Sequence, residues 1–257
     1  MAKQKDNKYK EFKVRLWLTD LNSTEVGIYQ HTRHQAKSRQ FSKDMDIFGE
    51  VSESGERKNF LAFREKLWEK ETNMERRLVI KLFSASMNWK GTMDLMMGRS
   101  MQLTHGANGF PVLAFNINLA NQDYIINVER SAYQWIGMPE KFSFFVMRDG
   151  TPYFYRLHRK FIGIGIDYHI YDQNNNKVGK LDGRVLRLGA TWNVRVLKDH
   201  SDAQLNSVLQ MFCGMLKFND ECRDHIRNLV AGMQRGKFNP SIGANESELY
   251  MNPRRTR

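Results

Sequence analysis

Hydrophobic and polar positions alternate over much of the chain up to about residue 197. Short segments rich in β-branched and aromatic residues follow one another, and Gly, Asn and Asp separate them. This pattern is typical of strands joined by tight turns. The candidate strands are residues 13–20, 78–84, 112–120, 123–133, 141–149, 152–161, 167–172, 177–183 and 191–197.

The part of the chain before residue 78 is less regular. Residues 21–55 are polar and show little period, so we expect loops there, with at most one short strand and a turn over 52–55. Residues 56–77 carry apolar side chains at helical spacing between charged ones, and these are Phe60, Phe63, Leu67 and Met74. This spacing predicts an amphipathic helix with one buried stripe, and a membrane or partner helix stays open as the alternative.

The period becomes helical again after residue 200. Ser201 or Asp202 can cap a helix over 202–218, which has a broad apolar stripe. A second, more charged helix is predicted over 219–236. The chain therefore divides into a lysine-rich tail (1–12), a barrel domain (13–218) with a helical insertion (56–77) and a core helix (202–218), a second helix (219–236) and a flexible basic tail (237–257).

A pattern near the end of the β-rich part recurs at an offset of 24 residues. The offset places Leu157 over Leu181 and Tyr168 over Trp192, and it also matches Lys160 with Arg184, Phe161 with Val185 and Gly165 with Gly189. The turns of the repeat contain Asp149-Gly150 and Gln173 to Asn176, which suit positive φ angles. The repeated unit is therefore an antiparallel hairpin, and successive hairpins have to close into a barrel or stack on something apolar.

The phrases FIGIGIDYHIYDQNNNKVGKLDG and RVLRLGATWNVRV within residues 142–218 resemble the Tubby C-terminal-like superfamily. Within that superfamily they are similar to the LURP-one-related proteins, and more distantly to the phospholipid scramblases. The resemblance implies a mainly β fold, with a closed antiparallel barrel of twelve strands around a central apolar C-terminal helix. Residues 205–218 would occupy the centre of such a barrel.

Composition indicates a basic protein with enough apolar residues for a sizeable core. The chain has 257 residues, 40 Lys plus Arg against 28 Asp plus Glu, and a formal net charge of +12. This balance favours anionic partners, namely nucleic acid, anionic lipid or an acidic protein. The sequence shows neither the apolar core of a signal peptide nor a run of 18 apolar residues, so we expect a cytoplasmic chain without a transmembrane segment.

Motifs that carry chemistry are missing from the sequence. It has no GxGxxG, Walker-type loop, GxSxG or HExxH, and the turn aspartates fit Asx turns better than acid and base roles. His31 and His34 lack neighbouring metal ligands, and Cys213 and Cys222 are interpreted as buried thiols. We therefore expect a protein that is not an enzyme and that holds no cofactor and no metal.

Basic residues concentrate in the repeat, where alternation would send many of them to the outside of a barrel. The candidate anion-binding residues are Arg156, Arg159, Lys160, Lys177, Lys180, Arg184, Arg187 and Arg195. Because Tubby-like barrels bind phosphoinositide headgroups, the resemblance implies a non-enzymatic scaffold or binding module that is peripheral to an anionic membrane.

Two alternatives stay open. Aromatic residues next to arginine at 153–156, with basic tails, also suit a sequence-nonspecific nucleic-acid-binding protein. A structural subunit of a larger assembly, held by protein partners or by self-association, would leave no motif.

Overall fold

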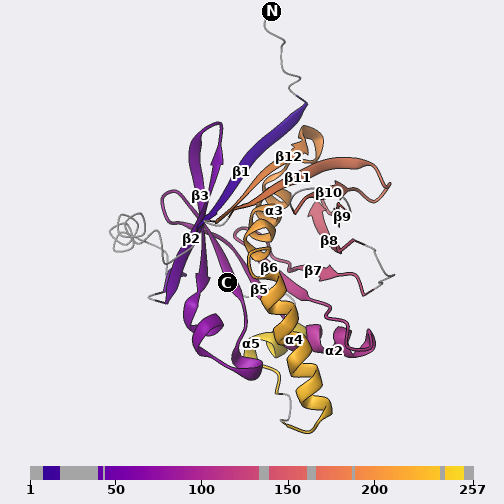
Figure 1. Ribbon diagram of the computed structural model, residues 1–257. Coiled ribbons are helices and arrows are strands. Elements are labelled where there is room, and N and C mark those ends of the chain that lie inside the picture. Colours follow the sequence, from indigo (N-terminus) through magenta and orange to yellow (C-terminus); the bar gives the residue numbers. More distant parts are fainter. Residues whose placement is uncertain are drawn as a thin grey trace, which may run out of the picture.

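The computed structural model describes residues 8–17, 40–42, 44–132, 139–160, 166–186, 189–237 and 241–251. Twelve antiparallel strands form a closed barrel in which each strand pairs with its neighbours in sequence and β1 pairs with β12 (Figure 1). The strands are β1 (Tyr9–Trp17), β2 (Met45–Glu53), β3 (Glu56–Arg64), β4 (Val79–Ser84), β5 (Trp89–Leu95), β6 (Ala114–Leu119), β7 (Ile126–Arg130), β8 (Lys141–Arg148), β9 (Thr151–Arg159), β10 (Tyr168–Tyr171), β11 (Lys177–Leu186) and β12 (Gly189–Leu197).

The helices lie mostly at the C-terminal end of the chain. After β12 come α3 (Ala203–Met215) and α4 (Asn219–Gln234), while α2 (Met97–Gly106) lies between β5 and β6. A short α5 (Ala244–Met251) follows α4. Figure 1 shows that α4 and α2 lie beside each other at one end of the barrel, and that α5 lies at the same end. The mainly β class and the closed antiparallel barrel are thus confirmed.

Helix α3 is the most deeply buried element. Asp202 caps it by accepting a hydrogen bond of 2.7 Å from the backbone N–H of Leu205, and the side chains from Leu205 to Met215 are all buried. Phe212 stacks edge-on against Phe142 of β8 and Tyr168 of β10, with ring centroids 5.0 and 5.4 Å apart. From another side of the helix, the Oε1 of Gln210 accepts a hydrogen bond from Asn59 of β3. Side chains of α3 therefore pack against strands that are far apart in the barrel order.

The 24-residue repeat corresponds to successive hairpins of the barrel. Leu157 and Leu181 are fully buried at matching positions of β9 and β11, and so are Tyr168 of β10 and Trp192 of β12. Gly189 has a φ of +143°, and a Cβ there would lie 2.4 Å from the carbonyl oxygen of Leu16. Glycine is thus required where β12 closes onto β1. The corresponding Gly165 lies outside the described residues, as do Phe161 and Arg187.

The predicted turns have the positive φ angles that their residues favour. Asp149 and Gly150 have φ values of 48° and 76° between β8 and β9, and Asn175 has 65° between β10 and β11. Ser54 and Gly55 turn the chain between β2 and β3 with φ values of 52° and 84°. Asn, Asp and Gly tolerate this region best, and the local sequence therefore fixes the hairpins.

The predicted helix over 56–77 is wrong. Residues Glu56–Arg64 form strand β3, and they are followed by a π-helical turn at Lys66–Lys70 and a 3₁₀ turn at Asn73–Glu75. Four consecutive residues, Phe60 to Phe63, are buried because both faces of this strand are covered. A strand that is buried on both faces loses its alternation, so its apolar residues match a helical spacing by chance.

Other boundaries also differ from the sequence prediction. Strand β1 begins at Tyr9, inside the predicted tail 1–12, β2 is a nine-residue strand where at most one short strand was expected, and β5 fills a region where no strand was assigned. Helix α2 was not predicted. The predicted flexible tail 237–257 contains α5, whose Glu246 is buried and accepts hydrogen bonds of 2.9 Å from the backbone N–H groups of Gly98 and Arg99. This carboxylate caps the first turn of α2, where helix N–H groups have no partner within the helix.

A buried ion pair reinforces the shortest seam of the barrel. Strands β7 and β8 pair through only two residue pairs. Arg130 of β7 and Glu140, which precedes β8, approach to 2.6 Å with side chains 4% exposed. The hydroxyl of Tyr168 and the amide of Asn219 donate to the same carboxylate. Because the Glu140 carboxylate is contacted by Arg130, Tyr168 and Asn219, the ion pair links β7, β8, β10 and α4.

Candidate anion-binding face

The outer face of the barrel differs between its two sides. Outward side chains of β2 to β5, such as Phe60 and Phe83, lie with Trp17 of β1 in a second apolar cluster outside the barrel. On the other side, β8 to β12 alternate between buried inward residues and partly exposed or exposed outward residues. The exposed side is where a partner can reach the wall of the barrel.

Outward residues of five successive strands form one row across this side. The residue pairs of the sheet connect Lys141 (β8) to His158 (β9), His158 to His169 (β10), His169 to Lys180 (β11) and Lys180 to Arg195 (β12). Directly paired residues point to the same face. At about 4.8 Å per strand, the row is roughly 19 Å long.

Further cations flank this row. Arg156 of β9 and Lys177 of β11 lie in the neighbouring row, on either side of Tyr171. Arg184 is exposed farther along β11, and Lys160 is exposed directly after β9. We call this surface the basic face, and it comprises Lys141, Arg156, His158, Lys160, His169, Lys177, Lys180, Arg184 and Arg195.

The basic face contains six of the eight candidate residues. Arg159 is paired with Tyr168, whose side chain is fully buried inside, so Arg159 lies on the opposite face of β9 and its assignment to the outer surface is wrong. Alternation along the strand explains the difference, since Arg156 and Arg159 are an odd number of residues apart. Arg187 lies outside the described residues.

Some of the cations are already engaged. Arg195 pairs with Glu11 at 3.0 Å and Lys180 with Asp182 at 3.2 Å. Arg156 donates to the backbone oxygen of Asp172 at 3.0 Å. These pairs are solvent-exposed or donate to neutral oxygen, so they compensate the positive charge only in part. The other cations of the face, Lys141, Lys160, Lys177 and Arg184, outnumber the neighbouring carboxylates of Glu11, Asp182 and Asp167.

The pKa values of the two histidines are lowered mainly by burial and further by the cations around them. Partial burial, then Lys141 and Arg156, and then His169, lower the pKa of His158 from 6.5 to about 4. Partial burial, followed by Lys177 and Lys160, also lowers the pKa of His169, although Asp167 acts in the opposite direction. Cations that disfavour protonation of a histidine will favour an anion at the same place.

Lys141, His158 and His169 were not among the candidates, although they make up three of the five positions of the row. The sequence assigned no role to His158 and His169, and Lys141 precedes the repeat. The signal that could have identified them is alternation, since each lies next to an apolar residue that points inward. Which residues meet across strands depends on the register, which composition does not give.

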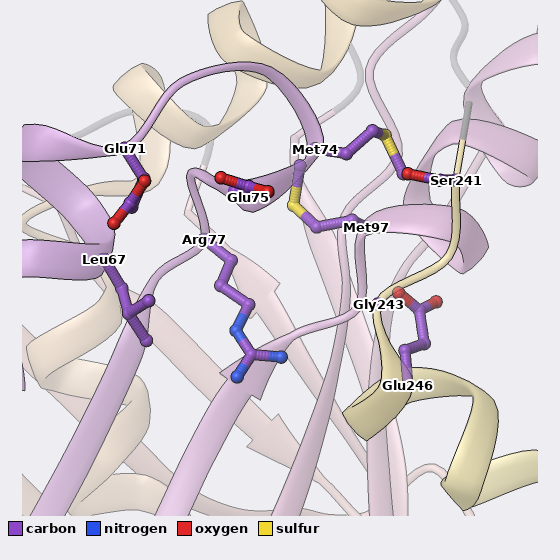
Figure 2. Close-up of a pocket in the computed structure, with 9 residues that line it drawn as sticks. All are labelled: Leu67, Glu71, Met74, Glu75, Arg77, Met97, Ser241, Gly243 and Glu246. Atoms are coloured by element: carbon purple, nitrogen blue, oxygen red, sulfur yellow. The ribbon is translucent and has the colours of Figure 1, made fainter. Parts of the chain in front are cut away.

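One cavity, of about 360 Å³, lies at the α2 end of the barrel. Figure 2 shows that its lining comes from residues 67–77, from Met97 and from the C-terminal segment that ends in α5. Two of its polar groups have internal partners: Glu246 binds the first turn of α2, and Arg77 lies 3.6 Å from Asp94. The lining contains neither histidine nor cysteine.

A second cavity, of about 560 Å³, includes His225. The Nε2 of this histidine lies 3.0 Å from the backbone oxygen of Arg76, and burial lowers its pKa, with Arg76 acting in the same direction.

Near the start of α3, the hydroxyl of Tyr155 lies 3.0 Å from Nδ1 of His200. Burial raises the pKa of Tyr155 to about 12, which keeps it protonated and unsuited to act as a base.

Thiol and metal chemistry find no support in the described part of the chain. Cys213 and Cys222 are fully buried, and burial raises the pKa of both thiols, which makes them poor nucleophiles. Among the described residues, no three His, Cys, Asp or Glu side chains gather as ligands for a metal ion. His31 and His34 lie outside these residues. None of the described helices has the length and hydropathy needed to cross a membrane.

Comparison with other proteins gives no relative. No family model matches the chain, and no match is found among curated proteins or among solved structures. The function is therefore inferred from the geometry of the chain itself.

Proposed function

We propose that the protein is a non-enzymatic binding module that attaches to anionic phospholipid headgroups through its basic face. The observation that carries this proposal is the row from Lys141 to Arg195, which brings cations of β8, β11 and β12 together with two histidines on one exposed surface. Lys and Arg near an anionic bilayer each contribute about 1 kcal/mol. Several of them on one surface would recruit the protein reversibly.

The architecture supports a Tubby-like barrel as the scaffold. The closed barrel has twelve antiparallel strands, and α3 is buried among strands from several of its parts. These features agree with the fold that the resemblance of residues 142–218 implies. We infer that the scaffold holds the basic face rigid, because every strand of the face is paired on both sides.

Sedimentation with vesicles tests the proposal. Wild-type protein should pellet with vesicles that contain phosphatidylserine or a phosphoinositide and stay in solution with neutral vesicles. A variant with Lys141, Lys177, Lys180 and Arg184 all changed to Glu should bind at least about 100-fold more weakly, because four attractive charges become repulsive. Arg156 is left unchanged because it also anchors the turn after β10.

A second variant controls for net charge. Changing Lys66, Lys70, Arg227 and Lys237 to Glu alters the net charge equally, and these exposed residues lie outside the basic face. It should bind vesicles nearly as well as the wild type. Equal weakening of both variants would mean that overall charge and not this face drives binding, and competition by single-stranded RNA over a salt series would move the function to nucleic acid.

A further inference from the structure

The hairpin formed by β8 and β9 presents an apolar surface beside the basic face. Phe145 is 55% exposed, and in the described part of the chain only Tyr9 and Ile242 are other large apolar residues with such exposure. Phe154 lies directly opposite it, with ring centroids 4.7 Å apart. Nearer the turn, Met147 and exposed Pro152 are the next pair on the same face.

Apolar and cationic residues are segregated along this hairpin. Starting from the turn, the outward pairs are Met147 with Pro152, Phe145 with Phe154, Ser143 with Arg156, and Lys141 with His158. At about 3.4 Å per residue, Phe145 lies roughly 13 Å from Lys141 along β8. The outward pairs next to the turn are thus apolar, the turn itself carries exposed Asp149, and the cations begin farther along the strands on the same surface.

We propose that Phe145 and Phe154 form an apolar anchor that enters the interfacial region of an anionic bilayer while the basic face binds the headgroups. The inference rests on the proposed function and adds the orientation of the bound protein. A surface with cations on one part and aromatic side chains on the adjoining part matches a bilayer interface, where anionic headgroups lie above apolar chains. Single exposed apolar residues are common, but four in adjacent positions form a patch.

The geometry favours a bilayer over single-stranded nucleic acid as the occupant. Stacking platforms present separate aromatic faces to successive bases. Here Phe145 and Phe154 pack on each other, and so do His158 and Tyr171 at 4.9 Å. Tyr155, which the sequence places beside Arg156, points into the core and is fully buried. Self-packed pairs at a hairpin tip are suited to insertion as one body.

The test combines an anchor variant with a salt series. Phe145→Ser/Phe154→Ser removes the apolar surface, and the core stays intact because both side chains point outward. Ile242→Ser is the matched control, since Ile242 is 54% exposed away from the hairpin. In about 0.1 M salt the anchor variant should still bind anionic vesicles through the cations. In about 1 M salt, where charges are screened, it should bind at least tenfold more weakly than the wild type and the control.

Depth is measured by labelling position 145. A Phe145→Cys variant carrying a bimane label should lose fluorescence on anionic vesicles made with brominated acyl chains, and a label at Asn228→Cys on α4 should not. The native thiols of Cys213 and Cys222 are fully buried and will not compete for the label in the folded protein.

The outcomes separate the two proposals. Wild-type protein that does not pellet with anionic vesicles overturns the proposed function together with the anchor. The anchor alone is overturned if the wild type pellets but the anchor variant binds equally well in high salt. It is also overturned if the wild type pellets but the label at position 145 is not quenched. Loss of single-stranded RNA binding in the anchor variant, without any vesicle binding by the wild type, reassigns the hairpin to nucleic acid.

Discussion

The outer faces of β2 to β5 and of β8 to β12 belong to one continuous sheet, yet they are built for different surroundings. Phe83 of β4 points outward and is fully buried in the outer apolar cluster, whereas Phe145 of β8 points outward and is 55% exposed. Lys81 of β4 is nearly buried and donates to Gln40, whereas Lys177 of β11 is exposed. The first side is devoted to stability, and the second is left available for a partner.

The largest expected effect is the difference in stability between a phenylalanine-to-alanine substitution on one side and the same substitution on the other. Phe83→Ala should lower the free energy of unfolding by about 3–5 kcal/mol, because it opens a cavity in a closed cluster. Phe145→Ala should change it by about 0.5 kcal/mol or less, because the side chain is largely in solvent already. Denaturant unfolding of both variants measures the difference, and similar losses would mean that the hairpin also has a structural role.

A smaller effect is expected from the histidines of the basic face. Because the pKa of His158 falls from 6.5 to about 4 on folding, the unfolded chain binds a proton in this window that the folded chain does not. Stability should therefore fall as the pH falls from about 6.5 to about 4, and the loss should end below that range. After allowance for solvent screening, the wild type should lose about 2 °C more in Tm than His158→Gln between pH 7 and pH 4.5.

The pKa of His158 should also depend on binding to vesicles. An anionic surface would offset the repulsion from Lys141 and Arg156, so the pKa of His158 should rise on anionic vesicles. Binding should then tighten as the pH falls, and His158→Gln should reduce this dependence. A titration with identical slopes in both proteins would show that His158 does not face the lipid.

The sequence predicted the strands β8 to β12 better than β2, β3 and β5, and the reason is physical. Strands exposed on one face keep the alternation that marks them, and this alternation identified residues 141–149 and 152–161. Strands covered on both faces have apolar runs, such as Phe60 to Phe63, which imitate a helix. The second cluster outside the barrel, which covers them, depends on residues distant in sequence and leaves no local period.

The candidate site was predicted in part for a related reason. Lys177 and Lys180 are three residues apart and reach one face because the register shifts between Ile170 and Tyr171, which alternation does not predict. Alternation and the 24-residue repeat indicated only that many basic residues of the repeat would point outward. They did not show that Lys141 and the two histidines complete the row, because that depends on the register of β8 against β9 and of β9 against β10. Arg159 was assigned to the outer face, although it pairs with Tyr168 and therefore lies on the inner face of β9.

A lysine acetylation footprint of the protein bound to anionic vesicles, compared with the free protein, tests directly whether the basic face binds the membrane. We expect protection of Lys160, Lys177 and Lys180 on the basic face, with unchanged labelling of exposed Lys66 and Lys70. Vesicle-bound protein that protects Lys66 and Lys70 instead, or labels all five equally, would contradict the assignment of this face as the membrane-binding surface.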